Sequence, residues 1–245
     1  MLVLEKGLAV IECFDGRQSL SVSEAAALTG LSRAAARRCL LTLVTLGYAT
    51  SEGPLFRLAP RILRLGSSYL TGAELPQIVQ PELDRISAAL HESCSASVLD
   101  GVDVLYIARA ATTRIISTDL RAGSRLPAYC NAMGRVLLAS LSPDEAETLL
   151  RGSDRPQRTA RTLTQVPELL AELDVVRRQD FAIVEGELEA GLITVAVPVR
   201  NAEGRTIAGV NIAAHTNRVD REMLITSALP HLRQLQASLR PLLRR

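Results

Sequence analysis

The sequence contains no long apolar run. Its longest apolar stretch, Cys39 to Ala49, is interrupted by two threonines and a glycine, and it falls well below the ~20 residues that a membrane-spanning helix needs. The first residues include Glu5 and Lys6 and lack the basic, apolar and small-residue order of a secretory signal. We therefore expect no transmembrane helix and no membrane partner, and we predict that the protein works in the cytoplasm.

Cysteine and histidine are few and scattered. The cysteines form no Cys-x-x-Cys pair, and no histidine stands at a metal-ligand spacing, so we expect no metal site. Unpaired cysteines usually behave as small buried apolar residues. A redox-responsive regulator that acts through Cys94 and Cys130 is kept as an alternative. The cysteines are Cys13, Cys39, Cys94 and Cys130, and the histidines are His91, His215 and His231.

Signatures of common catalytic machinery are also missing. The sequence has no Gly-x-Ser-x-Gly nucleophile elbow, no metalloenzyme motif and no phosphate-binding loop. We therefore predict that the protein is not an enzyme, and we expect no cofactor and no catalytic residue. The alternative is a small-molecule enzyme built on the C-terminal part of the chain. It would use Glu185 and Glu187 as acid and base, or Cys130 as a nucleophile.

Lysine is almost absent, and the arginines are clustered. Residues 1–72 carry eight Lys or Arg and five Asp or Glu, a net charge of +3, whereas the whole chain carries +2. Between Leu31 and Arg64, six arginines face a single acidic residue, Glu52. Clustered arginines favour contact with nucleic-acid phosphates; a solvated face of an arginine-rich protein is the alternative. The six are Arg33, Arg37, Arg38, Arg57, Arg61 and Arg64.

The composition is sufficient for two compact units. The chain has 245 residues, of which 47% are hydrophobic and 22% are charged, as is typical of folded globular proteins. Domains usually run to roughly 100 to 200 residues. We expect a small domain over residues 1–59, a linker helix over 60–73 and a larger domain over 74–245.

The first 59 residues have the start and stop signals of three helices. Apolar residues at helical spacing predict a first helix that ends before Gly16. Ser21-Val-Ser-Glu24 is a capping box, which opens a second helix that runs to about Leu28. After a glycine-containing turn, Ser32 caps a third helix, and Gly47 ends it.

The third helix and the hairpin after it are the predicted DNA-reading elements. In a helix-turn-helix protein the second helix of the motif enters the major groove, and here that helix begins with alanines and arginines. Tyr48–Thr50 and Leu55–Leu58 are typical of a two-stranded wing, in which Arg57 can reach a phosphate. We predict double-stranded DNA as a partner. The candidate DNA-binding residues are Ser32, Arg33, Ala34, Ala35, Arg37, Arg38 and Arg57.

Three segments resemble the DNA-binding signature of the IclR family of bacterial regulators. They are Leu4-Glu-Lys-Gly-Leu-Ala-Val-Ile11, Leu31-Ser-Arg-Ala-Ala-Ala-Arg-Arg38 and Leu46-Gly-Tyr48, and the second is similar to the branch that controls protocatechuate and p-hydroxybenzoate catabolism. The resemblance implies a homodimer or homotetramer on a palindromic operator. It also implies a linker helix from Pro60 that pairs with its twin; packing on its own winged domain is the alternative.

Residues 74–245 alternate between helices and short strands. Asp100-Gly101 is a hairpin signal, and hairpin-linked strands with helices grouped between them indicate an α+β domain with an antiparallel sheet. The resemblance, which covers nearly the whole chain, implies a GAF-like effector-binding fold with helices flanking the sheet. We expect helices over 74–91, 131–140, 143–150, 166–179 and from 221 onward, and strands over 95–99, 103–110, 115–120, 192–199 and 206–214.

The loop Gly123–Cys130 and the start of the next helix are the predicted effector site. A serine hydroxyl, an arginine fork and a helix N-terminus are groups that hold a carboxylate, and the loop resembles the effector loop of the same catabolic branch. A surface ion pair of Arg125 is the alternative. The candidate effector-binding residues are Ser124, Arg125, Leu126, Pro127, Cys130, Met133, Gly134, Glu185, Glu187, Thr194 and Asn211.

One segment departs from that branch. Leu192-Ile-Thr194 replaces a typical Leu-Arg-Ser run and so lacks a basic residue near the expected site. Thr194 and Asn211 are the remaining polar candidates on the last strands, and either can instead point outward. We predict a sequence-specific DNA-binding regulator that controls a catabolic operon in response to a small carboxylate, with an aromatic acid as the first choice.

Overall fold

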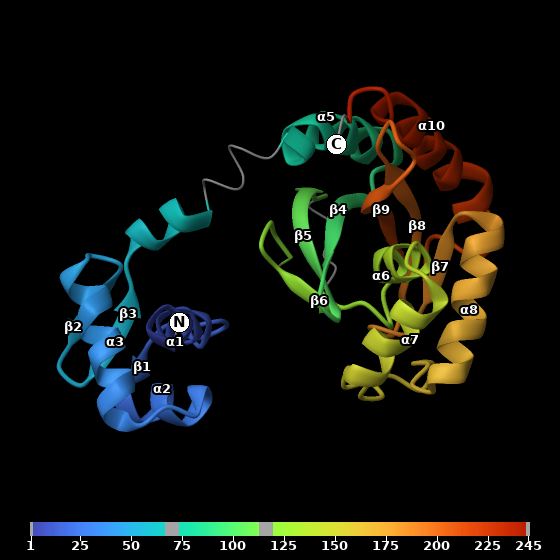
Figure 1. Ribbon diagram of the computed structural model, residues 1–245. Coiled ribbons are helices and arrows are strands. Elements are labelled where there is room, and N and C mark those ends of the chain that lie inside the picture. The colour runs from blue at the N-terminus through green and yellow to red at the C-terminus, as the bar shows by residue number, and fades with distance from the viewer. Residues whose placement is uncertain (1, 67–73, 113–119, 244–245) are drawn as a thin grey trace. The chain divides into compact units, whose positions relative to one another are not determined.

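The computed structural model describes residues 2–66, 74–112 and 120–243 (Figure 1). The chain divides into two compact units, Met1–Gly72 and Ala73–Arg245. Each unit has its own hydrophobic core, and each is described separately below.

In the first unit, three helices pack against a small antiparallel sheet of strand order β1-β3-β2. Its core joins Val10 of the first helix and Phe14 of the turn after it to Leu40 of the third helix and Phe56 of the last strand. The two-residue strand β1 was not predicted, because two residues are too few to show alternation. The elements are α1 (Leu2–Glu12), β1 (Leu20–Ser21), α2 (Val22–Thr29), α3 (Arg33–Thr45), β2 (Ala49–Glu52) and β3 (Leu55–Leu58).

The caps predicted for this unit are formed. The Ser21 hydroxyl accepts a hydrogen bond from the Glu24 backbone N–H over 3.3 Å, and a Glu24 carboxylate oxygen accepts one from the Ser21 N–H over 2.7 Å. Gly30 ends α2 in the left-handed conformation with φ 67°. The Ser32 hydroxyl accepts from the Ala35 N–H over 3.3 Å and caps α3. Together these contacts fix the turn between the two helices of the motif.

The described part of the predicted linker begins with a short 3₁₀ turn, η1 (Pro60–Ile62), with Pro60 at its first position. Residues 63–66 are helical. The rest of the predicted linker helix, residues 67–73, lies outside the described residues.

The second unit is built on a six-stranded antiparallel sheet of order β6-β5-β4-β9-β8-β7. This arrangement confirms the predicted α+β fold. The elements are α5 (Glu74–Leu90), β4 (Ser93–Asp100), β5 (Asp103–Ala110), β6 (Arg125–Pro127), α6 (Ala132–Ala139), α7 (Pro143–Gly152), α8 (Val166–Gln179), β7 (Ala182–Glu185), β8 (Leu192–Arg200), β9 (Thr206–His215), α9 (Arg221–Met223), η2 (Leu224–Ala228) and α10 (Leu229–Leu239).

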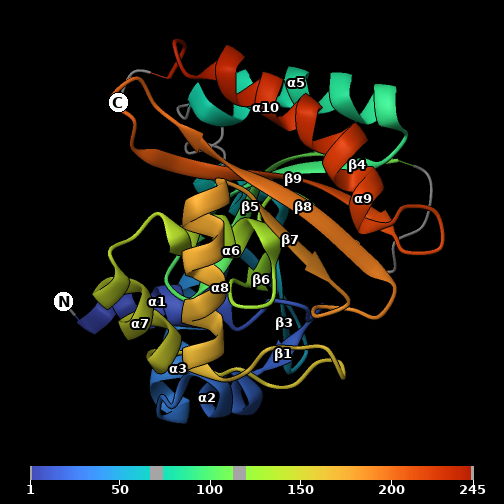
Figure 2. The same cartoon turned by 90° about the vertical axis from the view of Figure 1, so that its right-hand side faces the viewer.

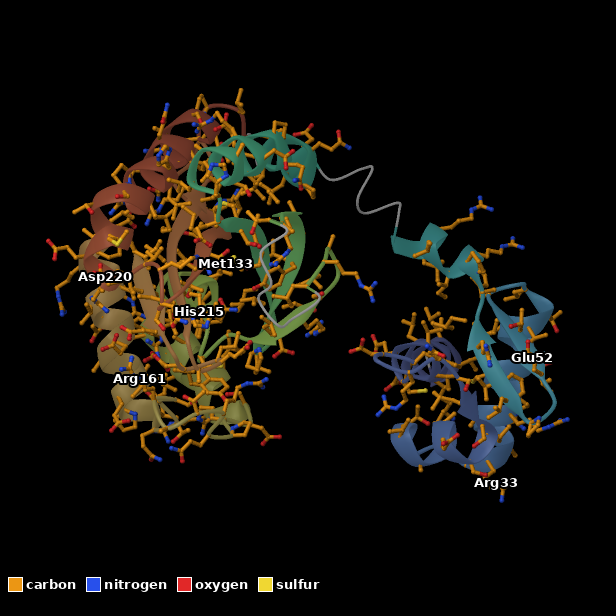
Figure 3. The ribbon with its side chains drawn as sticks, turned by 180° about the vertical axis from the view of Figure 1, so that it is seen from behind. Arg33, Glu52, Met133, Arg161, His215 and Asp220 are labelled. Atoms are coloured by element: carbon orange, nitrogen blue, oxygen red, sulfur yellow. The ribbon has the colours of Figure 1, made fainter. Side chains whose placement is uncertain are left out.

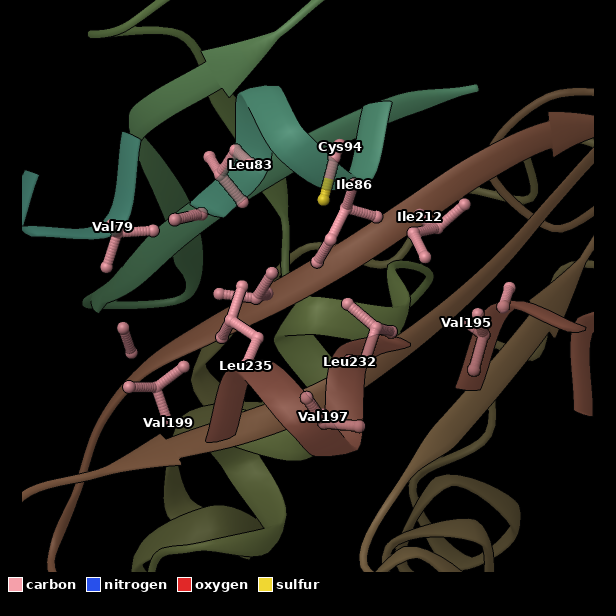
Figure 4. Packing of buried hydrophobic residues seen from close by; sticks show 14 of the residues in the cluster. Val79, Leu83, Ile86, Cys94, Val195, Val197, Val199, Ile212, Leu232 and Leu235 are labelled. Carbon is pink, nitrogen blue, oxygen red and sulfur yellow. The ribbon is translucent and has the colours of Figure 1, made fainter. Parts of the chain in front are cut away.

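Helices cover both faces of this sheet (Figure 2). On one face α5 and α10 pack over the strands, and Figure 4 shows Leu83 and Leu235 from these helices in one apolar cluster with Val197 and Ile212 from the sheet. On the other face α6, α7 and α8 enclose a second core. The sheet therefore separates two apolar layers, as an α+β domain requires.

Two strands differ from the prediction. β6 lies inside the segment predicted as the effector loop, and β7 was not predicted. β6 has three residues and β7 has four, so the alternation of each is too short to recognise. The strand predicted over 115–120 falls almost wholly outside the described residues, and Leu120 itself is not in a strand.

No helix within the described residues is both long enough and apolar enough to cross a membrane. In the same part of the chain, no three His, Cys, Asp or Glu side chains gather as a metal site would require.

Candidate DNA interface and effector cavity

The first half of α3 presents arginines to solvent. Arg33, Arg37 and Arg38 are exposed, and Figure 3 shows the Arg33 side chain extending away from its unit. Ala34 is also exposed, and its small side chain leaves room for close approach to the helix beside the arginines. Ala35, in contrast, is only 9% exposed and packs inward. The exposed face of α3 can therefore approach a duplex groove with three guanidinium groups.

The wing carries one further arginine of the predicted set. Arg57 on β3 lies opposite Thr50 on β2, and its guanidinium is 3.7 Å from the Glu52 carboxylate. Both side chains are exposed, with 49% and 72% of their surfaces accessible, and ion pairs of this kind contribute little free energy. Arg57 can therefore exchange Glu52 for a phosphate at small cost.

A β-bulge in β5 directs two important side chains to one face of the large sheet. Neighbouring residues of β4 pair with Tyr106 and Ala108, so Ile107 between them has no partner. A bulge of one residue reverses the alternation of the strand. Ile107 and Ala108 consequently both pack on the α5 side of the sheet, whereas Tyr106 packs on the α6 side. Arg109, two residues beyond Ile107, returns to the same side as Tyr106.

A small cavity lies on that face, between the sheet and the start of α6. Strands β5, β7, β8 and β9 contribute to it, and Asn131, which caps α6 by accepting from the Met133 N–H over 2.9 Å, closes one side. The lining residues are Tyr106, Arg109, Leu120, Cys130, Asn131, Val184, Glu187, Leu188, Leu192, Thr194, Asn211 and Ala213.

Three polar side chains form a row across the sheet at this cavity. Ser95 on β4 pairs with Arg109 on one side and with Asn211 on the other. Arg109 Nη1 donates to Ser95 Oγ over 3.3 Å. Arg109 Nε and Asn211 Oδ1 are buried and have no hydrogen-bond partner among the described residues. Because buried polar atoms are rarely left unpaired, these two atoms mark places where a ligand could bond.

Arg109 is the one cation, and Glu187 the one anion, among the described residues that line the cavity. Glu187 Oε2 already accepts hydrogen bonds from Arg135 Nη2 over 2.7 Å and from the Leu163 N–H over 3.2 Å. Burial raises the pKa of Glu187, against the opposing charge of Arg135. Because Glu187 is paired with Arg135, the positive charge of Arg109 is the one that can attract an anionic ligand.

The enclosed free volume of the cavity is about 30 Å³. One water needs about 10 to 15 Å³ of such space, whereas a cavity of about 150 Å³ accepts a benzene ring. The chemistry of the lining suits a small carboxylate, but an aromatic ring enters only if lining side chains move apart.

Most of the predicted effector loop lies elsewhere. Arg125 is half-exposed and forms ion pairs with Asp100 and Asp103 at the β4–β5 hairpin, and the Ser124 hydroxyl accepts from the Arg121 N–H over 3.0 Å in a local turn. Ser124, Arg125, Leu126 and Pro127 are not among the cavity-lining residues. The structure instead shows the surface ion pair that was the alternative for Arg125.

Three further candidates also have other surroundings. Met133 is fully buried in the α6 core, and its sulfur accepts from the Ser97 hydroxyl over 3.3 Å. Gly134 allows α6 to touch the backbone of Ala128. Glu185 pairs with the exposed Arg161, whose position Figure 3 marks. Of the predicted effector set, the cavity brings together Cys130, Glu187, Thr194 and Asn211.

The cysteines do not form a redox pair in this structure. Cys94 packs in the core on the α5 side of the sheet and Cys130 in the core on the α6 side, so the sheet lies between their sulfurs. Burial raises the pKa of both thiols, that of Cys130 to about 11. Thiolate is the reactive form, and it is scarce at neutral pH in such surroundings. These contacts do not support the redox-responsive alternative.

Comparison with known proteins finds close relatives along nearly the whole chain. The chain is 45% identical to the Pca regulon regulatory protein of Pseudomonas putida, over 95% of this chain and 80% of that protein. It is 40% identical to the p-hydroxybenzoate hydroxylase transcriptional activator of Acinetobacter baylyi, over 98% of this chain and 90% of that protein. Both are transcription regulators by name.

A solved structure matches the second unit. It is a double mutant of the PobR inducer-binding domain from Acinetobacter in complex with 3-hydroxybenzoic acid. It is 34% identical in sequence, covers 69% of this chain and 98% of that chain, and superposes with a TM-score of 0.65.

Family models account for both units. The IclR helix-turn-helix domain matches residues 3–53, and the C-terminal domain of bacterial IclR transcriptional regulators matches residues 67–239. The second match alone spans more than half of the chain, and it includes the sheet and the cavity described above. The protein therefore belongs to the IclR family of bacterial transcription regulators.

Proposed function

We propose that the protein is a cytoplasmic regulator of an aromatic-acid catabolic operon, and that a hydroxybenzoate-like acid is its effector. The observation that carries this proposal is Arg109, a cation with an unpaired Nε at a cavity that is otherwise largely apolar. A guanidinium in such surroundings binds a carboxylate strongly, because little water competes for it.

The rest of the lining fits an aromatic acid. With the carboxylate at Arg109, the ring contacts the apolar side chains of Leu120, Val184 and Leu188 after they move apart. A ring hydroxyl can form a hydrogen bond with Thr194. This residue lies on β8, two positions before Ala196, the residue that pairs with Asn211. The effector set proposed here is therefore Tyr106, Arg109, Asn131, Glu187, Thr194 and Asn211, with Cys130 in the wall.

Similar proteins support this class of ligand. The Acinetobacter inducer-binding domain holds 3-hydroxybenzoic acid, and the names of the two regulators above refer to the pca regulon and to p-hydroxybenzoate hydroxylase. Over the aligned residues, this chain is 45% and 40% identical to the two regulators and 34% identical to the inducer-binding domain.

The decisive experiment compares two arginines. Calorimetry of the purified protein with 4-hydroxybenzoate should show binding, and Arg109→Ala should weaken it by roughly 10- to 150-fold, since a hydrogen bond to a charged group contributes about 1.5 to 3 kcal/mol. Arg125→Ala is the matched control, because it removes an arginine of the originally predicted loop that lies outside the cavity. Equal affinities for the two variants would refute the assignment of Arg109.

For the DNA side, we propose that Arg33, Arg37 and Arg38 of α3 and Arg57 of the wing contact the duplex, with Ala34 against base edges. Ser32 acts through the cap that starts the helix. Ala35, which faces the interior of its unit, is left out of this proposal.

We further propose that the protein binds a palindromic operator as a homodimer or homotetramer. Apolar side chains of α1 and of residues 63–66 are exposed, among them Leu4 and Leu63, each with 72% of its surface accessible. Large exposed apolar side chains that gather on one element often mark an interface between copies. Sedimentation of the purified protein measures the stoichiometry directly, and a monomer at micromolar concentration would contradict this proposal.

A further inference from the structure

We propose that Gln80 of α5 is a positioning residue that links Arg109, and so the occupancy of the cavity, to the helix by which the chain enters the second unit. This inference rests on the proposed function, because Arg109 is important here as the group that binds the carboxylate.

The link consists of hydrogen bonds between one side chain and one backbone position. Gln80 Nε2 donates to the Arg109 carbonyl over 3.1 Å, and the Arg109 N–H donates to Gln80 Oε1 over 3.2 Å. The second Nε2 hydrogen goes to the Asp84 carboxylate, over 2.8 Å. The amide of Gln80 is therefore bonded on both its oxygen and its nitrogen, and its orientation is fixed.

These bonds occur where β5, paired with β4 on one side, has no neighbouring strand on its other side among the described residues. β6 pairs with β5 only from Asp103 to Leu105, and loop residues then bond to the backbone of Tyr106. At Arg109 the side chain of Gln80 exchanges both bonds with the backbone, as a partner strand would do. An edge position is the place where a strand can shift most easily, so the contact that holds it controls how far Arg109 can move.

The helix ladder of α5 is interrupted directly after Gln80. Pro81 lies inside α5, and proline has no N–H to bond the carbonyl four residues earlier and also crowds it. Val79 before the proline and Leu83 and Ile86 beyond it are all fully buried in the core. The missing backbone bond therefore separates the turns before the proline from those after it, and Gln80 is the last residue of the first part.

Those first turns begin at Glu74, immediately after the segment that joins the two units in sequence. When a carboxylate engages the Arg109 guanidinium, the backbone of β5 adjusts, and Gln80 carries the adjustment to residues 74–80. If the two states of this helix end differ in DNA affinity, acid binding and DNA binding change one another by the same factor.

The test measures this coupling as a ratio. The Kd for a duplex that the protein itself selects from a random library is measured by anisotropy with and without saturating 4-hydroxybenzoate. For the wild type we expect a ratio in the usual range for coupled sites, about 5- to 150-fold. Gln80→Leu should reduce the ratio to about twofold or less, while its Kd for the acid, measured by calorimetry, stays within about tenfold of the wild type because Arg109 is still present.

The control is Glu82→Gln, which removes the half-exposed ion pair with Arg85 on the same helix and should leave the ratio unchanged. Gln80→Met, which keeps the length and flexibility of the side chain, replaces Gln80→Leu if the latter does not fold. A wild-type ratio in the Gln80 variant refutes the role of Gln80 alone. A wild-type protein that fails to bind the acid refutes the proposed function, and this inference with it.

Discussion

At the scale of single residues, the most restrictive position near the cavity is Gly134. A Cβ atom there would lie 2.1 Å from the carbonyl oxygen of Ala128, far inside contact distance. The sequence resemblance suggested Gly134 as an effector residue, whereas the structure gives it a packing role, in which it allows α6 to approach the segment that forms the cavity wall.

This role leads to a prediction about stability. In an exposed helix Gly→Ala stabilises by roughly 1 kcal/mol, but at Gly134 overpacking should reverse the sign and cost about 1 to 3 kcal/mol or more. Thermal unfolding of Gly134→Ala should therefore begin at a lower temperature than that of the wild type. Gly152→Ala is the matched control, since no atom lies within 4 Å of the added Cβ. Equal melting temperatures for the two variants would show that α6 moves away freely.

The residue scale also shows why the cavity was only partly predicted. Thr194 and Asn211 lie on long strands whose alternation is regular. The sequence left open whether each side chain points inward or outward, and in the structure both line the cavity. Arg109 was not predicted, although its strand was, because simple alternation places it on the face opposite Tyr106. The bulge at the unpaired Ile107 moves Arg109 to the same face as Tyr106. Pairing between strands cannot be inferred from the alternation of residues within one strand.

At the scale of elements, the strongest predictions were those with local causes. The capping box at Ser21, the cap at Ser32 and the Asp100-Gly101 hairpin each depend on residues within four positions, and each is formed. The short strands β1 and β6 pair with strands well separated from them in the sequence, and β7 has only four residues; none of the three was predicted. The predicted effector loop stays a prediction; Arg125 in it pairs with Asp100 and Asp103 of the β4–β5 hairpin, more than 20 residues away in the sequence.

One junction of elements allows a test that depends on pH. Asp180 ends α8 in the left-handed conformation with φ 61°, and its carboxylate accepts hydrogen bonds from Arg200 of β8 and Arg233 of α10. Burial acts to raise the pKa of Asp180, but the hydrogen bonds and charges of the two arginines together hold it below its ordinary value.

A carboxyl group whose pKa is lowered by folding stabilises the folded state above its unfolded pKa, and this stabilisation is lost as the pH falls through the folded value. Asp180→Asn removes the charge but keeps a residue that tolerates the left-handed conformation. The variant should melt at a lower temperature than the wild type at pH 7, and the difference should shrink below pH 3.8, the ordinary pKa of the group. Asp174→Asn, at an exposed pair with Arg177, should change little. A difference independent of pH would contradict this account.

At the scale of the whole molecule, the protein has two groups of arginines. One is the exposed set on α3, and the other is Arg109 at the cavity. The two sites differ in solvation. The arginines of α3 are exposed, and we expect their binding of phosphates to be driven mainly by release of counterions, which makes the affinity depend strongly on salt. Arg109 is half-buried and its Nε is fully buried, and salt screens a pairing at a partly buried group less. DNA binding and acid binding should therefore respond differently to ionic strength.

The last prediction follows from this difference. Each lost phosphate contact reduces the slope of log K against log salt by about 0.9, so replacing both Arg37 and Arg38 by Ala should reduce the magnitude of the slope by about twice that amount. The measurement uses anisotropy on a duplex selected from a random library, between about 50 and 200 mM salt. Arg151→Ala, an exposed arginine of α7 paired with Glu147, is the control and should keep the wild-type slope. If the double variant also keeps that slope, the two arginines of α3 do not contact the phosphates, and the DNA interface must lie on another surface.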